Sequence, residues 1–119
     1  MQAYVRSANF IPAKTGHVKK EFKGLILWHR SNKKRYHPVA VAAYVHHVFE
    51  TIHPFRDGNG RTGRLMVNFI LRKNGFPMAN IRYKERRKYY QALQKANASE
   101  LKPLVDLIAD YAIKSEPLF

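Results

Sequence analysis

The run His53-Pro-Phe-Arg-Asp-Gly-Asn-Gly-Arg-Thr-Gly-Arg64 separates two helical patterns in this sequence. Before it, apolar side chains recur at helical spacing, and that helix should end before Pro54, because a residue that precedes a proline avoids helical geometry. Gly58 and Gly60 then make the middle of the run too rich in glycine for regular structure. A second helix is expected to begin at the end of the run, so the run predicts a loop between two helices.

The sequence on either side of this run predicts an all-α domain with a small β-element at its start. Five segments show the apolar periodicity of helices: residues 18–30, 38–52, 61–72, 83–96 and a segment after residue 99. Pro38 suits the first residue of its helix, Asn74-Gly75 suits a helix C-terminus, and Ser99 is expected to be the N-cap of the last helix. Residues 4–17 favour a short β-hairpin instead.

Length and composition limit the classes of protein to which the chain can belong. Its 119 residues correspond to one domain, and 45% of them are hydrophobic, which is enough for a packed core. The absence of cysteine excludes disulfide scaffolds and thiol catalysis. No apolar run approaches the roughly 20 residues of a membrane span and no signal peptide is recognisable, so we expect no membrane partner and take the cytoplasm as the default location. The net charge of +14 favours anionic partners.

The glycines and arginines of the run are suited to binding a polyphosphate. Gly58 and Gly60 precede a helix, whose first N–H groups and dipole attract anions. Arg61 and Arg64 are three residues apart and therefore lie on one helical face beside that turn. The Gly-x-Gly-x-x-Gly spacing is not a dinucleotide-binding fingerprint, because a helix precedes it where a strand is required.

His53 and Asp57 add two groups that phosphoryl or nucleotidyl transfer needs. The imidazole of His53 can exchange a proton with a hydroxyl. The carboxylate of Asp57 is a hard oxygen donor that suits Mg²⁺, which usually binds one or two carboxylates together with phosphate oxygens. The sequence has no Gly-x-x-x-x-Gly-Lys-Ser/Thr segment, which argues against an ordinary P-loop ATPase.

The run resembles the signature of Fic-domain proteins, His-x-Phe-x-(Asp/Glu)-Gly-Asn-Gly-Arg-x-x-Arg, at every fixed position. The resemblance extends from about Arg6 to about Tyr111 and includes Asn74-Gly75-Phe76-Pro77 and Lys88-Tyr89-Tyr90. It points to the AMP-transferring branch, which contains the animal enzyme that modifies an endoplasmic-reticulum chaperone. It implies a compact bundle of about five helices, formed by a single Fic core domain over residues 1–119, with the catalytic loop at 53–64.

Fic enzymes of this branch transfer AMP from ATP to a Ser, Thr or Tyr hydroxyl of a target protein and release pyrophosphate. By this resemblance His53 would take the proton of the attacking hydroxyl, and Asp57 would hold Mg²⁺, or Mn²⁺ in its place. Gly58, Asn59 and Gly60 would surround the α-phosphate. Because Gly60 is followed by arginine, the loop fits the transfer of AMP rather than of phosphate.

The resemblance also assigns residues to the rest of the nucleotide. Arg61 would contact the β-phosphate and Arg64 the γ-phosphate. Tyr90 and Asn97 would line the adenine pocket. The alternative for Tyr90 is an ordinary core residue of its helix.

Target binding and inhibition are also implied by the resemblance. The hairpin at 4–17 resembles the flap to which a target protein docks by strand addition. Many Fic proteins are inhibited by a helix with the motif Ser/Thr-x-x-x-Glu-Gly/Asn, whose glutamate pairs with the second arginine of the signature. None of the five glutamates of the sequence completes this motif: Glu21, Glu50, Glu85, Glu100 and Glu116. We therefore expect Arg64 to be uninhibited in this chain, with such a helix supplied upstream in cis or by a partner in trans; a homodimer is left open.

Three other interpretations remain. The same site could remove AMP from a modified protein, although the missing glutamate favours transfer. The cluster from Arg82 to Lys88, with its tyrosines, could bind nucleic acid, although a solvated helix face is favoured. His46, His47 and Glu50 could join His53 in a metal site, but adjacent histidines on a helix point about 100° apart.

Overall fold

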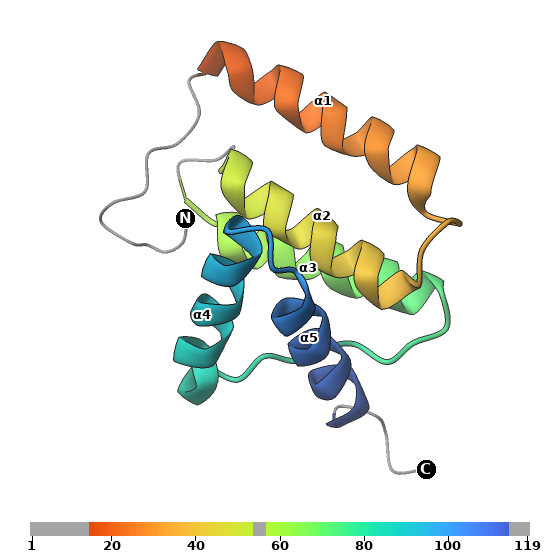
Figure 1. Cartoon of the computed structure of the whole chain (residues 1–119), viewed down its shortest axis with the longest axis vertical. Coiled ribbons are helices and arrows are strands. Elements are labelled where there is room, and N and C mark those ends of the chain that lie inside the picture. The colour runs from red at the N-terminus through yellow and green to blue at the C-terminus, as the bar shows by residue number, and fades with distance from the viewer. Residues whose placement is uncertain (1–14, 54–56, 115–119) are drawn as a thin grey trace.

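The computed structural model describes residues 15–53 and 57–114, and it forms a bundle of helices in this part of the chain. The elements are α1 (Thr15–Asn32), α2 (Pro38–Ile52), α3 (Asn59–Lys73), the short 3-10 helix η1 (Tyr83–Glu85), α4 (Arg86–Asn97) and α5 (Lys102–Lys114) (Figure 1). No strand occurs within the described ranges. The predicted all-α fold with five helices is therefore confirmed.

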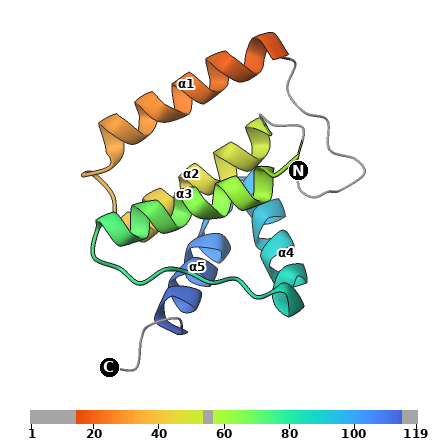
Figure 2. The same cartoon turned by 180° about the vertical axis from the view of Figure 1, so that it is seen from behind.

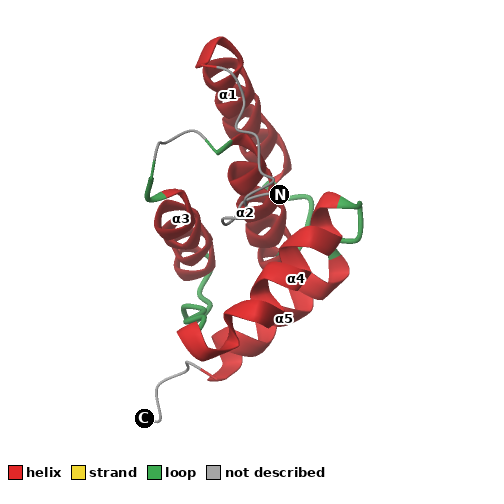
Figure 3. Cartoon of the chain, turned by 90° about the vertical axis from the view of Figure 1, so that its left-hand side faces the viewer, coloured by secondary structure: helices red, strands yellow, loops and turns green. Residues whose placement is uncertain are grey.

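The bundle is organised around α2, which contacts α1, α3, α4 and α5. Figure 3 shows α3 on one side of α2 and the pair α4 and α5 on the other. The apolar stripe expected for this helix supplies the centre of the core: Val41, Ala42, Val45, Phe49 and Ile52 are all buried. Each large side chain of this kind contributes roughly 1.5–3 kcal/mol when it leaves water.

Both ends of α2 have clear local causes. Pro38 is its first residue, as predicted, and the imidazole Nδ1 of His37 accepts a hydrogen bond of 3.1 Å from the backbone N–H of Val39. The helix ends at His53, whose φ of 50° is left-handed and whose N–H donates to the carbonyl of Phe49. The chain therefore turns sharply just where the glycine-rich run begins.

The C-terminus of α3 ends at Asn74-Gly75, as the sequence predicts. Gly75 has a φ of 84°, and its N–H donates to the carbonyl of Arg72 at 3.1 Å. The next N–H, that of Phe76, donates to the carbonyl of Leu71 at 2.9 Å, which completes a Schellman motif. Figure 2 shows α3 lying alongside α2, with the connection to η1 leaving its far end.

The prediction for Ser99 was wrong, because this residue ends α4 instead of starting α5. Ser99 has a φ of 72°, its N–H donates to the carbonyl of Ala96, and the N–H of Glu100 donates to the carbonyl of Lys95. These are again the two bonds of a Schellman motif, with serine in the left-handed position that glycine usually takes. The last helix begins three residues later, at Lys102.

The expected hairpin at residues 4–17 lies outside the described residues, apart from its last three. Thr15 to His17 form the first turn of α1, so the helix starts before the predicted Val18. No helix of the described segments is long and apolar enough to cross a membrane.

Candidate active site

His53 stands at the junction between α2 and the glycine-rich run. A left-handed φ is uncommon for a residue other than glycine, and such conformations gather at functional sites. Here the conformation is held because α2 ends with the hydrogen bond from His53 to Phe49. The half-buried imidazole is therefore fixed at the end of a buried helix, beside the loop that leads to α3.

The N-terminus of α3 lies at the other end of that loop, after the undescribed residues 54–56. Gly58 is the N-cap, with a φ of 79° that only glycine adopts readily, and its carbonyl accepts the first helical bond from Thr62 at 3.0 Å. The backbone N–H groups of Gly60 and Arg61 precede that bond, so the helix supplies them with no carbonyl. Asp57 is exposed directly before this turn. The first turn of α3 therefore offers the N–H groups and the dipole that favour an anion, with a carboxylate directly before it.

Both arginines of the run lie at this end of α3, but their environments differ. Arg61 is exposed to solvent, whereas Arg64 is half-buried. The guanidinium of Arg64 folds back over the first turn, and its Nη1 lies 3.1 Å from the position that a Cβ of Gly60 would occupy. A second guanidinium is therefore held against the glycine-rich turn, where it adds positive charge to the helix dipole.

Gly63 allows α3 to approach α2 closely. A Cβ on Gly63 would lie 2.6 Å from Oε2 of Glu50 and 2.8 Å from Nδ1 of His46, which are shorter than real side chains allow. Glu50 and His46 are both buried on α2. The close contact fixes the first turn of α3 relative to the helix that carries His53.

The buried polar side chain next to this contact is His46. Its Nε2 is hydrogen-bonded to the hydroxyl of Tyr89, and the two rings stack at 5.5 Å with an angle of 20°. Burial, followed by the nearby charge of Arg64, lowers the pKa of His46 to about 3. Burial also raises the pKa of Tyr89, whose hydroxyl is hydrogen-bonded to Arg64. At neutral pH both His46 and Tyr89 are therefore uncharged.

Tyr90 and Asn97 lie on α4, next to this cluster. Tyr90 is 39% exposed, so its alternative interpretation as a core residue was wrong; the neighbouring Tyr89 is the core residue, with its ring centroid 5.4 Å away. Asn97 accepts a hydrogen bond from Thr51 at 3.2 Å, and its side chain also interacts with His47, whose pKa is lowered chiefly by burial. Asn97 therefore contacts the last turn of α2, directly before His53.

The comparisons with known proteins agree with this arrangement. The Fic/DOC family matches over residues 2–71, which is more than half of the chain. This chain belongs to the Fic/DOC family.

Two curated relatives of this Fic domain carry the same name. A protein adenylyltransferase Fic of Aedes aegypti is 44% identical over 84 residues, which are 71% of this chain and 17% of that protein. The protein of the same name from Drosophila persimilis is 46% identical over 83 residues, 70% of this chain and 16% of that protein. The matched region thus spans less than a fifth of these curated relatives.

Solved structures show the same fold. Fic-1 of C. elegans superimposes with a TM-score of 0.80 and 33% identity over 92% of this chain and 34% of that chain. A Fic-domain-containing signalling protein of Bacteroides thetaiotaomicron gives a TM-score of 0.85 and 28% identity over 93% of this chain and 48% of the other. The helical arrangement in Figure 1 is therefore the Fic fold.

Residues 54–56 of the Fic signature lie outside the described residues, whereas the residues on either side of them are described. Of the expected site residues, His53 ends α2, the segment from Asp57 to Arg64 forms the start of α3, and Asn97 is hydrogen-bonded to Thr51 in the last turn of α2. Tyr89 was not expected as a partner of Arg64, and His46 was considered only as a metal ligand. Their apolar neighbours at helical spacing, such as Phe49 and Leu93, mark both as facing the core.

The metal-binding potential of this Fic domain rests on Asp57. Within the described residues, no group of three or more His, Asp or Glu side chains could hold a metal ion, and the Nε2 of His46 is already bonded to Tyr89. An exposed carboxylate beside an anion-binding turn nevertheless fits Mg²⁺, because this ion takes its other ligands from phosphate and water.

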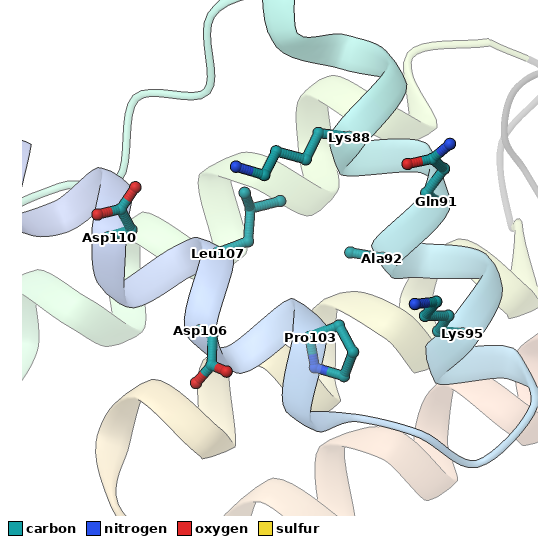
Figure 4. A pocket seen from close by; sticks show the side chains of 8 residues that line it. All are labelled: Lys88, Gln91, Ala92, Lys95, Pro103, Asp106, Leu107 and Asp110. Carbon is teal, nitrogen blue, oxygen red and sulfur yellow. The ribbon is translucent and has the colours of Figure 1, made fainter.

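A separate groove between α4 and α5 is not part of this site. It has a volume of about 530 Å³, and Figure 4 shows lysines on its α4 wall and aspartates on its α5 wall, with the apolar Ala92 and Leu107 between them. None of the expected site residues lines it.

Proposed function

We propose that this Fic domain transfers AMP from ATP to a hydroxyl group of a target protein. The observation that supports the proposal is the sequence of elements: His53 ends α2 in a left-handed conformation, a short loop follows, and α3 begins with a glycine-rich turn over which Arg64 folds. A base and an anion-binding turn with a guanidinium are the groups that nucleotidyl transfer requires. The names of the insect relatives, protein adenylyltransferase Fic, support the same reaction.

In the proposed reaction the hydroxyl oxygen of the target attacks the α-phosphorus of ATP. Its proton passes to the imidazole of His53, the bond between the α-phosphorus and the bridging oxygen breaks, and pyrophosphate leaves with Arg61 and Arg64 against its phosphates. The N–H groups at Gly58, Asn59 and Gly60 stabilise the charge that grows on the α-phosphate. Tyr90 and Asn97 hold the adenine, so the nucleotide spans from α4 to the start of α3.

Asp57 is the residue that would hold a divalent cation. Mg²⁺, or Mn²⁺, supplies charge neutralisation on the phosphates when it is bound. Asp57 would fix the cation at the edge of the first turn of α3.

The experiment that tests the proposal follows a label from the α-phosphate. The protein and its His53→Ala variant are incubated with α-labelled ATP, Mg²⁺ and a cell lysate, and labelled proteins are separated by electrophoresis. Labelled bands should depend on His53, while ATP binding persists in the variant. If no band, including the domain itself, depends on His53, the proposal is wrong.

Inhibition through Arg64 is a further part of the proposal. A peptide with the motif Ser/Thr-x-x-x-Glu-Gly/Asn should lower ATP turnover, because its glutamate would pair with the guanidinium that we assign to the γ-phosphate. The matched peptide with glutamine in place of the glutamate should leave turnover unchanged. Equal turnover with both peptides would show that Arg64 is not the point of control.

A further inference from the structure

Arg64 is linked to the centre of the core through two uncharged side chains. Its guanidinium hydrogen-bonds the hydroxyl of Tyr89, and that hydroxyl also bonds Nε2 of His46. Tyr89 is 3% exposed and His46 is fully buried. The inner end of this chain of bonds is therefore rigid, whereas its outer end lies over the first turn of α3, beside Gly60.

Chemistry limits the direction of the hydrogen bonds in this chain. A guanidinium has only donors, so the oxygen of Tyr89 must accept from Arg64. The hydroxyl of Tyr89 then donates to Nε2 of His46 when the neutral imidazole carries its proton on Nδ1, the tautomer that we assign to it. His46 can accept because burial keeps its imidazole neutral. The neutral ring is thus a required part of the link, and a charged ring would have no acceptor to offer.

Other features keep the imidazole of His46 in the orientation that this link needs. Its ring lies at 20° to that of Tyr89, with the ring centroids 5.5 Å apart. It also lies against Gly63, where a Cβ would come within 2.8 Å of Nδ1. Gly63 directly precedes Arg64, so the ring contacts both the backbone that carries the arginine and the tyrosine that binds it.

We propose that Tyr89 and His46 are positioning residues, which hold the guanidinium of Arg64 over the anion-binding turn so that it meets the terminal phosphate of a nucleoside triphosphate. The inference rests on the proposed function for the identity of the ligand. Without the hydroxyl of Tyr89, a long and half-exposed arginine would populate several rotamers, and its contact with the phosphate would cost more conformational entropy.

The test compares nucleotides that differ in their number of phosphates. The dissociation constants of ATP, ADP and AMP are measured by titration calorimetry with Mg²⁺ for the wild-type chain and for Tyr89→Phe. The variant should weaken ATP binding about five-fold, as expected for one hydrogen bond. It should leave the constants for ADP and AMP close to those of the wild type, because they lack the terminal phosphate.

A double-mutant cycle separates positioning from a general structural effect. Arg64→Ala should also weaken ATP binding, and adding Tyr89→Phe to Arg64→Ala should then weaken it no further. His46→Gln keeps an acceptor near the position of Nε2 and should bind ATP almost as the wild type does, whereas His46→Leu should show the loss seen in Tyr89→Phe. Thermal unfolding of each variant identifies those that are folded.

Tyr111→Phe is the matched control. Tyr111 is another buried tyrosine, whose hydroxyl donates to Glu85 far along the chain from the signature. The inference is overturned if Tyr89→Phe changes ATP binding no more than Tyr111→Phe does, if it weakens AMP equally, or if its effect adds fully to that of Arg64→Ala. If the wild type transfers no AMP but Tyr89→Phe still weakens ATP binding through Arg64, the proposed reaction fails and the positioning role stands.

Discussion

His46 is an ionisable residue that is fully buried, and it should make folding depend on pH. Its pKa is lowered to about 3 by burial, while an unfolded chain would bind a proton near pH 6.5. Between these values the unfolded state holds more protons, so the free energy of unfolding must fall as the pH falls. For His46 alone the loss from pH 7 to pH 5 is about 2 kcal/mol.

This dependence can be measured by urea unfolding at a series of pH values. In the wild type the free energy of unfolding should decrease from pH 7 to pH 5, a window that lies above the titration of most carboxylates. His29 and His47, whose pKa values are also lowered by burial, add to the decrease. In His46→Gln the slope should be shallower by the contribution of His46. Equal slopes in the two proteins would mean that His46 is not buried in its neutral form.

The two glycines Gly63 and Gly24 should respond oppositely to alanine, because their helices differ in what lies around them. Gly63→Ala would drive a Cβ into His46 and Glu50 and should destabilise the protein by about 2 kcal/mol. Gly24 lies within α1 with nothing within 4 Å of a Cβ, so Gly24→Ala should stabilise by about 0.5 to 1 kcal/mol. Urea unfolding of both variants checks the prediction. A neutral Gly63→Ala would contradict the close approach of α3 to α2.

The end of α4 offers a second prediction at this scale. Ser99 adopts a left-handed φ of 72°, which glycine adopts without a steric penalty. Ser99→Gly should therefore raise the free energy of unfolding by about 0.5 to 1 kcal/mol. Ser31→Gly, in the last turn of α1, should lower it instead, since glycine is a poor helix former. Thermal melts compare the stability of the two variants with that of the wild type. A destabilised Ser99→Gly would argue against the Schellman motif.

The elements that could be predicted from sequence are those with a local cause. The stripe of α2 and the Asn74-Gly75 terminus rest on helical spacing and on the backbone preference of glycine, and both are confirmed. A serine between two helices can be the N-cap of the second or can end the first, so the residue type alone could not assign Ser99 to the end of α4. The bond between Tyr89 and His46 joins positions 43 residues apart, and only the packing of α4 on α2 reveals it.

The charge of the whole molecule should make its stability depend on salt. A net charge of +14 on 119 residues repels itself in the compact state. Raising the ionic strength from about 0.01 M to about 0.15 M shortens the Debye length from about 30 Å to about 8 Å and should raise the melting temperature. A melting temperature that falls with added salt would show that attractive ion pairs dominate instead.

The basic residues around η1 and the start of α4 do not by themselves indicate nucleic acid. Arg82, Lys84, Arg86, Arg87 and Lys88 are all exposed, as in the solvated helix face that the sequence favours. Binding of DNA or RNA that falls steeply with salt and is unaffected by His53→Ala would support a nucleic-acid partner.

Parallel labelling with ATP carrying its label at the α- or the γ-phosphate tests most directly whether the domain transfers AMP. Label from the α-phosphate should appear on protein in the wild type and be absent in His53→Ala, while label from the γ-phosphate should be recovered in pyrophosphate. Protein that carries the γ-label, or α-labelling that persists without His53, would contradict AMP transfer by the site between α2 and α3.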